Sequence, residues 1–216
     1  MTMRAADLSP PDWAFFPGAL LVAAAMVFLA LQIRPAGDSP VFEEGRYQLE
    51  GAALNQLIAT PGTEVAFIAD ADTPFVRTRA LASMAAPGSS IGVAALLPAD
   101  FEAQVVGRVV AVEAVWRAAP DTTSGAGLTQ ANLRYATTGG GDSGWRALPL
   151  GEAFEPVGFC YQVRGDAPVT GQEWVGVWPD AEGRGRAVDL RMLRATIQAP
   201  ETTVADCEAA LTAPGG

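Results

Sequence analysis

The stretch from residue 46 to residue 198 contains no run of helical periodicity, and this restricts the fold more than any other feature of the sequence. Short apolar runs are separated instead by clusters of Gly, Pro, Asp and Ser, which is the pattern of β-strands joined by turns. About nine strands at this spacing predict an all-β fold in which two antiparallel sheets form a sandwich. The expected strands are residues 46–51, 64–69, 91–97, 105–118, 131–137, 145–150, 157–164, 174–178 and 188–197.

Two of these strands have patterns that indicate their place in the sandwich. The strand at 157–164 alternates between the two faces of its sheet, with an apolar row on one face and Cys160 on the other. We expect the apolar row to face the core, and it consists of Val157, Phe159, Tyr161 and Val163. The strand at 105–118 is apolar on both faces for much of its length, which is typical of a central strand.

The last expected strand changes phase within its length. Val188, Leu190 and Met192 have one parity, whereas Leu193, Ala195 and Ile197 have the other. Because side chains alternate across a strand, such a change requires one extra residue. The sequence therefore predicts a β-bulge near residues 192–194.

The segment from Trp13 to Ile33 carries no charged residue. About 21 residues of α-helix span roughly 31 Å, which matches the hydrocarbon core of a bilayer. The rings of Trp13, Phe15 and Phe16 at one end suit the membrane interface. A cleaved signal peptide and a buried core helix are the alternatives. The apolar run is long for a signal peptide, however, and Arg4 is the one basic side chain before it. We therefore expect a transmembrane helix at 13–33, with the lipid bilayer as its partner.

Only two cysteines are present, and both follow this segment: Cys160 and Cys207. An isolated pair behind an export segment is most simply a disulfide, and two unpaired buried thiols are the alternative. The bond would close a loop of about 47 residues, for which the chain-entropy estimate is near 4 kcal/mol. It would tie the C-terminal tail, residues 201–216, to the outside of the sheet. Thr202 or Thr203 is expected to cap a short helix there.

The expected compartment follows from charge and cysteine use. Arg4 and the amino terminus slightly outweigh Arg34 in positive charge, which favours a cytoplasmic N-terminus. All the basic residues are Arg, a composition typical of GC-rich bacterial genomes. We therefore expect a single-pass protein of the inner membrane with its disulfide-containing domain in the periplasm. Its parts would be a cytoplasmic tail at 1–12, the transmembrane helix, a linker at 34–45 and a sandwich domain at 46–200.

The charged residues exclude several functions. The chain has 14 basic and 24 acidic residues, no His and a formal charge of −10. Without His or Lys it lacks imidazole catalysis, imidazole zinc sites and the lysine of a phosphate-binding loop. So acidic a chain is not expected to bind nucleic acid. No cofactor or metal is expected, although the oxygen-rich turns at Asp70, Asp72 and Asp142 leave a structural calcium ion as an alternative.

Four segments of the C-terminal half resemble a known family. They read VVGRVVAVEAVWRAAP, LTQANLRYATTGGGDSGWRALPL, EPVGFCYQV and EWVGVWPDAEGRGRAVDLRMLRATIQ. Their strand spacing is similar to that of jelly-roll β-sandwiches of the galactose-binding-like, carbohydrate-binding-module type. The resemblance implies a jelly-roll fold. That fold serves glycan binding, protein binding and purely structural roles, so it does not define the function.

Two pairs of residues are candidates for binding. Trp174 and Trp178 flank Gly176 on one strand face, where two indole rings would form a platform for a sugar or a protein partner. The alternative is that both rings fill the core. Arg184 and Arg186 lie on a turn and would recognise a carboxylate or a lipid headgroup, or else form exposed salt bridges with neighbouring acids.

No set of catalytic residues stands out, so we expect a protein that is not an enzyme. The first expectation is a membrane-anchored accessory subunit that binds a membrane-protein complex or another envelope component. A glycan-binding module for envelope polysaccharide, using Trp174 and Trp178, is the alternative. A glycoside hydrolase that uses two carboxylates is the third.

Overall fold

The computed structural model describes residues 40–69, 73–86, 90–120, 127–137, 141–166 and 173–213, together with five helical positions between residues 19 and 26. The chain divides into one unit of residues Met1–Gly37 and another of Asp38–Gly216. Within the described part, no helix is long and apolar enough to cross a membrane. The residues expected at the membrane, Trp13, Phe15, Phe16 and Ile33, lie outside the described residues.

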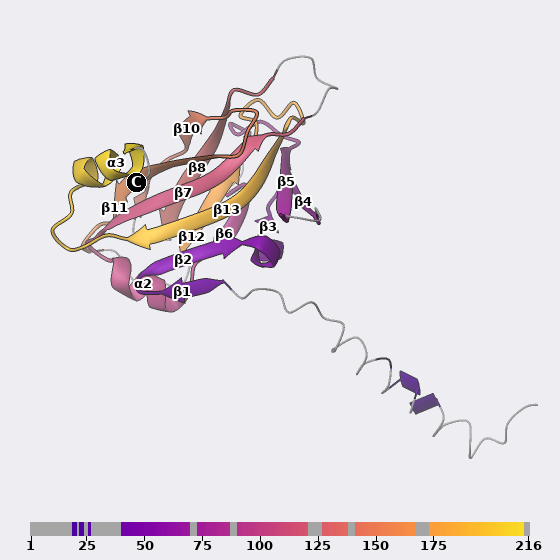
Figure 1. The fold of residues 1–216 in the computed structure, drawn as a ribbon, viewed down its shortest axis with the longest axis horizontal. Coiled ribbons are helices and arrows are strands. Elements are labelled where there is room, and N and C mark those ends of the chain that lie inside the picture. Colours follow the sequence, from indigo (N-terminus) through magenta and orange to yellow (C-terminus); the bar gives the residue numbers. More distant parts are fainter. Residues whose placement is uncertain are drawn as a thin grey trace, which may run out of the picture. The chain divides into compact units, whose positions relative to one another are not determined.

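The first sheet is built around one long strand, β13 (Figure 1). On one side β13 pairs with β7, which pairs in turn with β11. On the other side it pairs with β5 and then with β2, and β4 and β1 continue the sheet beyond these two. The strands are β1 (Val41–Glu43), β2 (Arg46–Glu50), β4 (Thr63–Ile68), β5 (Phe75–Ala80), β7 (Val109–Ala118), β11 (Glu155–Gln162) and β13 (Ala187–Ile197).

A β-bulge lies where β13 changes its partner. The pairing with β7 slips by one residue between Leu190 and Met192, so Arg191 is the extra residue. Before the slip β13 pairs with β5, and after it with β2. The side chains that face the core accordingly change parity, from Val188 before the bulge to Leu193 after it. The predicted bulge is confirmed, slightly earlier in the strand than expected.

The second sheet has the order β10-β8-β12-β6-β3, with β9 paired to β8, and every pairing is antiparallel. Its strands are β3 (Ile58–Ala59), β6 (Val93–Leu96), β8 (Gln130–Thr137), β9 (Gly141–Asp142), β10 (Arg146–Pro149) and β12 (Glu173–Trp178). One buried cluster joins the sheets, since it contains Val112 and Trp116 of the first sheet and Leu133 and Val175 of the second. The described residues thus form the predicted two-sheet antiparallel sandwich.

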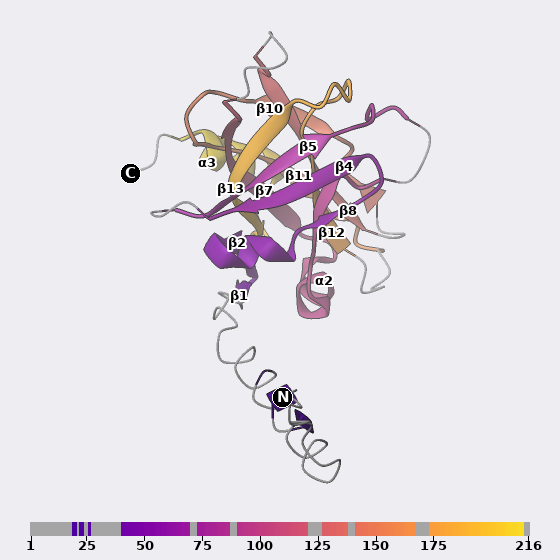
Figure 2. The same ribbon diagram turned by 90° about the vertical axis from the view of Figure 1, so that its right-hand side faces the viewer.

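Two short helices interrupt the strand pattern at places that the sequence did not indicate. They are a 3-10 helix, η1 (Gly51–Gln56), and α2 (Ala99–Val105). Helix α2 lies at one end of the sandwich (Figures 1 and 2) and buries Phe101 and Val105, which are four residues apart on one helix face. The strand expected from residue 105 therefore begins only at Val109, because Val105 still belongs to the helix. Gly107, with φ of +73°, turns the chain between the two elements.

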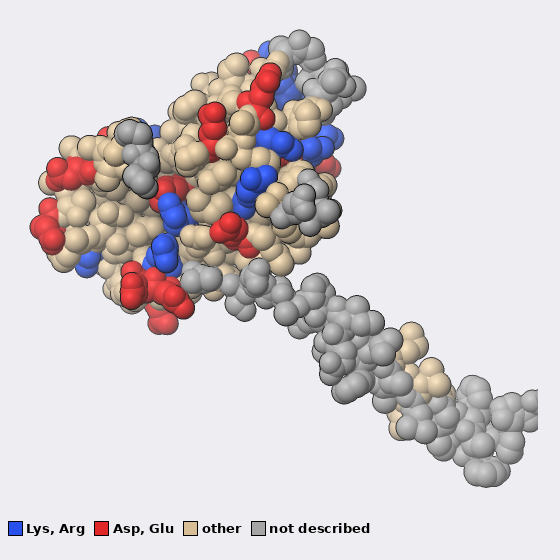
Figure 3. Space-filling view, viewed as in Figure 1, with Lys and Arg blue, Asp and Glu red and all other residues tan. Residues whose placement is uncertain are grey.

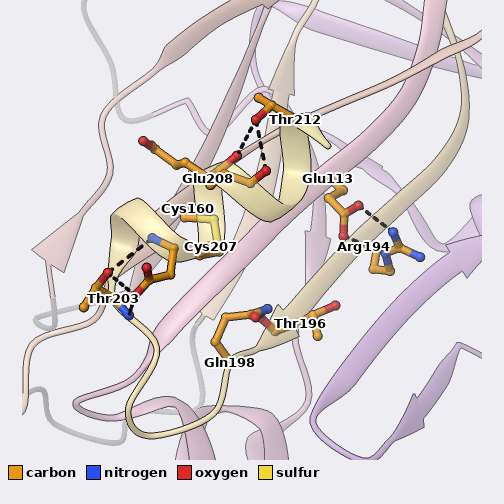
Figure 4. Close-up of a disulfide and its surroundings, with 11 residues drawn as sticks. Glu113, Cys160, Arg194, Thr196, Gln198, Thr203, Cys207, Glu208 and Thr212 are labelled. Atoms are coloured by element: carbon orange, nitrogen blue, oxygen red, sulfur yellow. Dashed lines mark hydrogen bonds and ion pairs between the residues drawn. A yellow bond between two sulfur atoms is a disulfide. The ribbon is translucent and has the colours of Figure 1, made fainter. Parts of the chain in front are cut away.

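The C-terminal helix α3 (Val204–Thr212) covers the outside of the first sheet (Figure 4). The predicted disulfide is present and joins Cys160 of β11 to Cys207 of α3. Around it, Val109 and Ala111 of β7 form a second small buried cluster. This explains why β7 is apolar on both faces near its start: one face lines the sandwich core, and Val109 and Ala111 on the other are covered by α3.

Helix α3 begins at the residue type that the sequence indicated. The hydroxyl of Thr203 accepts a hydrogen bond from the backbone N–H of Asp206, and the Asp206 carboxylate accepts one from the backbone N–H of Thr203. This reciprocal arrangement is a capping box, which satisfies two backbone donors that the helix itself leaves unpaired. The tail is therefore fixed at its start by the cap and near its middle by the disulfide.

Candidate functional site

The side chains of β12 divide between the core and the outside of the second sheet. Val175 and Val177 face the core and are 1% and 0% exposed. Because side chains alternate along a strand, Trp174, Gly176 and Trp178 project from the opposite, outer face. The two tryptophans therefore do not fill the space between the sheets.

Four residues on this outer face form what we call the tryptophan face: Arg134, Trp145, Trp174 and Trp178. The guanidinium carbon of Arg134 lies 5.4 Å from the ring centre of Trp145 and 5.4 Å from that of Trp174. Both rings are partly exposed. A guanidinium within about 6 Å of a ring is attracted by the negative charge of its π-face, so Arg134 holds the two indoles in place.

Arg134 is itself fixed by an ion pair. Its Nε donates to Oδ1 of Asp142 at 2.8 Å, and its Nη2 contacts the other carboxylate oxygen. Asp142 lies on β9 and Trp174 on β12, and both are paired with Ala136 of β8, which lies between them. Burial lowers the pKa of Arg134 from its ordinary value. The pair adds no net charge to the tryptophan face but leaves polar groups next to two aromatic rings.

Trp178 is the buried residue of the tryptophan face. It is only 3% exposed, and its indole Nε1 donates to the backbone carbonyl of Asp180 at 3.0 Å. Its ring packs edge-on against Trp145, with 5.9 Å between the ring centres. Trp178 therefore offers almost no surface to a ligand, whereas Trp174 and Trp145 do.

Gly176 allows the close packing around Trp145. A Cβ atom at this position would lie 2.2 Å from the carbonyl oxygen of Ile91 and 3.3 Å from the Trp145 ring. Any larger residue would push both away. Gly176 thus leaves room for the ring of Trp145, which lies in the connection between β9 and β10.

An exposed apolar residue extends the tryptophan face toward the edge of the sheet. Leu96 of β6 pairs directly with Trp174 and is 56% exposed. Residues paired in this way point to the same face of a sheet. Trp174 is therefore flanked by apolar surface on one side and by the Arg134–Asp142 pair on the other.

Arg184 and Arg186 lie on the turn after β12, where they form salt bridges. The fully buried carboxylate of Asp180 accepts hydrogen bonds from Nη2 of Arg186 at 2.7 Å and from its Nε at 3.0 Å. Burial by itself raises the pKa of Asp180, but the bonds from Arg186 and from two backbone N–H groups outweigh it and leave that pKa below the usual value. Arg184 pairs with Glu182 in solvent. The structure thus places both arginines in an acid-paired turn.

Tyr135, Glu173 and Glu102 are ionisable side chains buried inside the sandwich, where the sequence alone did not indicate them. Tyr135 donates a hydrogen bond to Oε2 of Glu173 at 2.5 Å, and both residues, like Glu102 of α2, are at most 1% exposed. Burial raises the pKa of Glu173 to about 7, with the charge of Glu102 adding to the effect and the Tyr135 bond opposing it. Burial also raises the pKa of Tyr135, and the neighbouring carboxylate of Glu173 raises it further.

The described residues contain no group of three or more His, Cys, Asp or Glu side chains that could hold a metal ion. Of the residues considered for calcium, Asp70 and Asp72 lie outside the described residues. The third, Asp142, is the partner of Arg134.

No protein-family model and no curated protein matches the chain. Among solved structures, the CBM22-1 xylan-binding domain of Xyn10C from Paenibacillus barcinonensis is 13% identical with a TM-score of 0.44, over 65% of this chain and 85% of that one. A Stig cyclase, Fisc from Fischerella sp. TAU, is 12% identical with a TM-score of 0.40, over 79% and 94%. The module BiXyn10A CBM1 is 9% identical with a TM-score of 0.38, over 69% and 96%. Two of these three solved structures are carbohydrate-binding modules.

Proposed function

We propose that this protein binds a carbohydrate through the tryptophan face and does not cleave it. The observation that carries this proposal is the pair of partly exposed indoles, Trp174 and Trp145, held on either side of Arg134. Rings that are fixed before binding lose little freedom when a ligand stacks on them, so more of the contact energy appears as affinity. The apolar faces of a sugar ring suit such a surface.

The charge of the tryptophan face favours a neutral sugar. The positive charge of Arg134 is neutralised by the carboxylate of Asp142, so the tryptophan face does not need a charged ligand to compensate it. The Asp142 side chain is 38% exposed, and its oxygens accept hydrogen bonds from hydroxyl groups. Apolar stacking with a few polar groups that fix orientation is the usual composition of a small-molecule site.

Catalysis by two carboxylates is not supported by the positions of the acids. Glu102 and Glu173, whose proximity raises the pKa of Glu173, are each only 1% exposed. A glycoside hydrolase needs its two carboxylates on either side of the bond that it cleaves. The accessory-subunit function stays a prediction, because the segment on which it depends lies outside the described residues.

The test is native gel electrophoresis of the full chain in mild detergent, with soluble xylan, mixed-linkage β-glucan or galactomannan in the gel. We expect at least one of these neutral polysaccharides to retard the protein. Replacing Trp174 by Ala should weaken that retardation at least about tenfold, as is usual for a central aromatic contact. Trp174→Phe, which keeps a ring, should retain part of it. Absence of retardation by all three polymers, or full retardation of Trp174→Ala, would contradict the proposal.

A further inference from the structure

The outer face of the first sheet carries a group of basic side chains that the tryptophan face does not involve. We call it the arginine cluster, and it consists of Arg77 of β5, Arg117 of β7 and Arg191 of β13, arranged around Asp189. Strand pairing places Arg77 and Arg117 directly opposite Asp189, one on each neighbouring strand. The bulge in β13 adds Arg191 to the same face.

Asp189 fixes two of these arginines. Its carboxylate is fully buried, and Arg77 donates to both oxygens, at 2.7 and 3.1 Å. Arg117 donates to Oδ2 from its Nε at 3.2 Å and lies at 3.1 Å through its Nη2. The side chain of Arg117 is nevertheless 29% exposed. One negative charge is therefore shared between two guanidinium groups, which reach solvent in fixed positions.

Arg191 has no carboxylate partner within the described part of the chain. Its guanidinium lies 3.9 Å over the ring of Phe154, and its Nη2 donates to the neutral hydroxyl of Thr73. Its Nε is buried and has no hydrogen-bond acceptor among the residues that the structure describes. Arg117 lies over the same ring at 4.4 Å. Phe154 thus brings together two cations that would otherwise repel each other.

The arginine cluster is a positive region on an acidic protein. Among the described residues, Arg117 pairs with Asp189 and Arg191 pairs with no carboxylate, whereas the whole chain has a formal charge of −10. Figure 3 shows basic side chains gathered over the part of this face where β7 ends and β13 begins. Guanidinium groups held in place bind planar oxyanions through paired charge-assisted hydrogen bonds.

We propose that Arg117 and Arg191 form a binding site for an oxyanion, meaning a carboxylate or sulfate group, either free or carried on an acidic polysaccharide. The anion would neutralise the charge of Arg191, whose described partners are the neutral Phe154 ring and Thr73 hydroxyl. The Phe154 ring and Asp189 position the two donors before binding. This site lies on the other sheet from the tryptophan face and does not depend on it.

The test is isothermal titration of the full chain with sodium sulfate and, separately, with oligogalacturonate at low ionic strength. We expect binding of both, weakened by added NaCl. Arg191→Gln should weaken it at least about tenfold, because a charged donor is lost. Arg164→Gln is the matched control, since Arg164 pairs with Asp166 on an exposed turn outside the cluster. It makes the same change in net charge and should leave binding unchanged.

Several results would overturn the proposed oxyanion site. If Arg191→Gln and Arg164→Gln weaken anion binding equally, the attraction is a general effect of net charge and the site is overturned. The site is also overturned if the unaltered protein binds neither sulfate nor oligogalacturonate. Binding only to vesicles of anionic lipid would also overturn it. If Arg191→Gln lowers the melting temperature, Arg191→Lys keeps the charge but removes the planar fork. Binding by that variant as tight as in the unaltered protein would then refute recognition by the guanidinium.

Discussion

The buried carboxyl group of Glu173 should make the stability of this protein depend on pH in an unusual direction. Its pKa is about 7 in the folded state, against an ordinary value of 4.5. The folded protein therefore binds this proton more tightly than the unfolded chain does. The resulting stabilisation is complete below about pH 4.5 and is lost as the pH rises to about 7. At 1.36 kcal/mol for each pKa unit, the loss amounts to about 3 kcal/mol.

Glu173→Gln isolates this contribution, because the amide keeps the shape and still accepts the hydrogen bond from Tyr135. The assay is urea unfolding of the full chain in mild detergent, followed by tryptophan fluorescence at pH 4.5 and pH 8. From pH 4.5 to pH 8 the unaltered protein should lose about 3 kcal/mol of stability that the variant does not lose. The free energy of unfolding of the variant minus that of the unaltered protein should therefore increase by about 3 kcal/mol. Contributions from other carboxyl groups cancel in this difference. Glu208→Gln, on the exposed surface of α3, is the control. A difference between variant and unaltered protein that stays constant with pH would refute the assignment.

Two further predictions concern the packing on each face. Trp178→Ala should lower the free energy of unfolding by about 3–5 kcal/mol, because the indole is buried; thermal unfolding by circular dichroism measures this, and an unchanged melting temperature would contradict the burial. Cys207→Ala should cost up to about 4 kcal/mol from the loss of a 47-residue closed loop. Dithiothreitol should destabilise the unaltered protein by the same amount and leave the variant unaffected, whereas equal sensitivity of both would contradict the disulfide.

The long, apolar strands of this fold could be predicted from the sequence, because their side-chain periodicity is strong. The parity change in β13 even predicted the bulge, since a core residue moves to the other face unless an extra residue is present. Strand β5 was missed because its core-facing side chains, Val76, Thr78 and Ala80, form a weak apolar row. Arginines occupy the alternate positions, so the segment did not resemble a buried strand.

The tryptophan face was only half predictable for a different reason. Trp174 and Trp178 follow the alternation of a single strand, so their shared face could be deduced from spacing alone. Their unequal exposure depends on Trp145 and on the chain near Ile91, which approach from distant parts of the sequence. Arg134 has the right parity on its own strand, but its position between two rings requires the pairing of β8 with β12. Contacts of this kind depend on tertiary structure.

The exclusive use of arginine acquires a physical meaning in this structure. On the tryptophan face Arg134 lies between two indoles while it pairs with Asp142, and in the arginine cluster Arg117 lies over Phe154 while it pairs with Asp189. Each position requires a cation that presents a flat face to a ring and several N–H donors in its plane. Lysine offers neither, because its charge is a compact ammonium group on a flexible stem. The absence of lysine is therefore compatible with both proposed sites, because each of them depends on a guanidinium group.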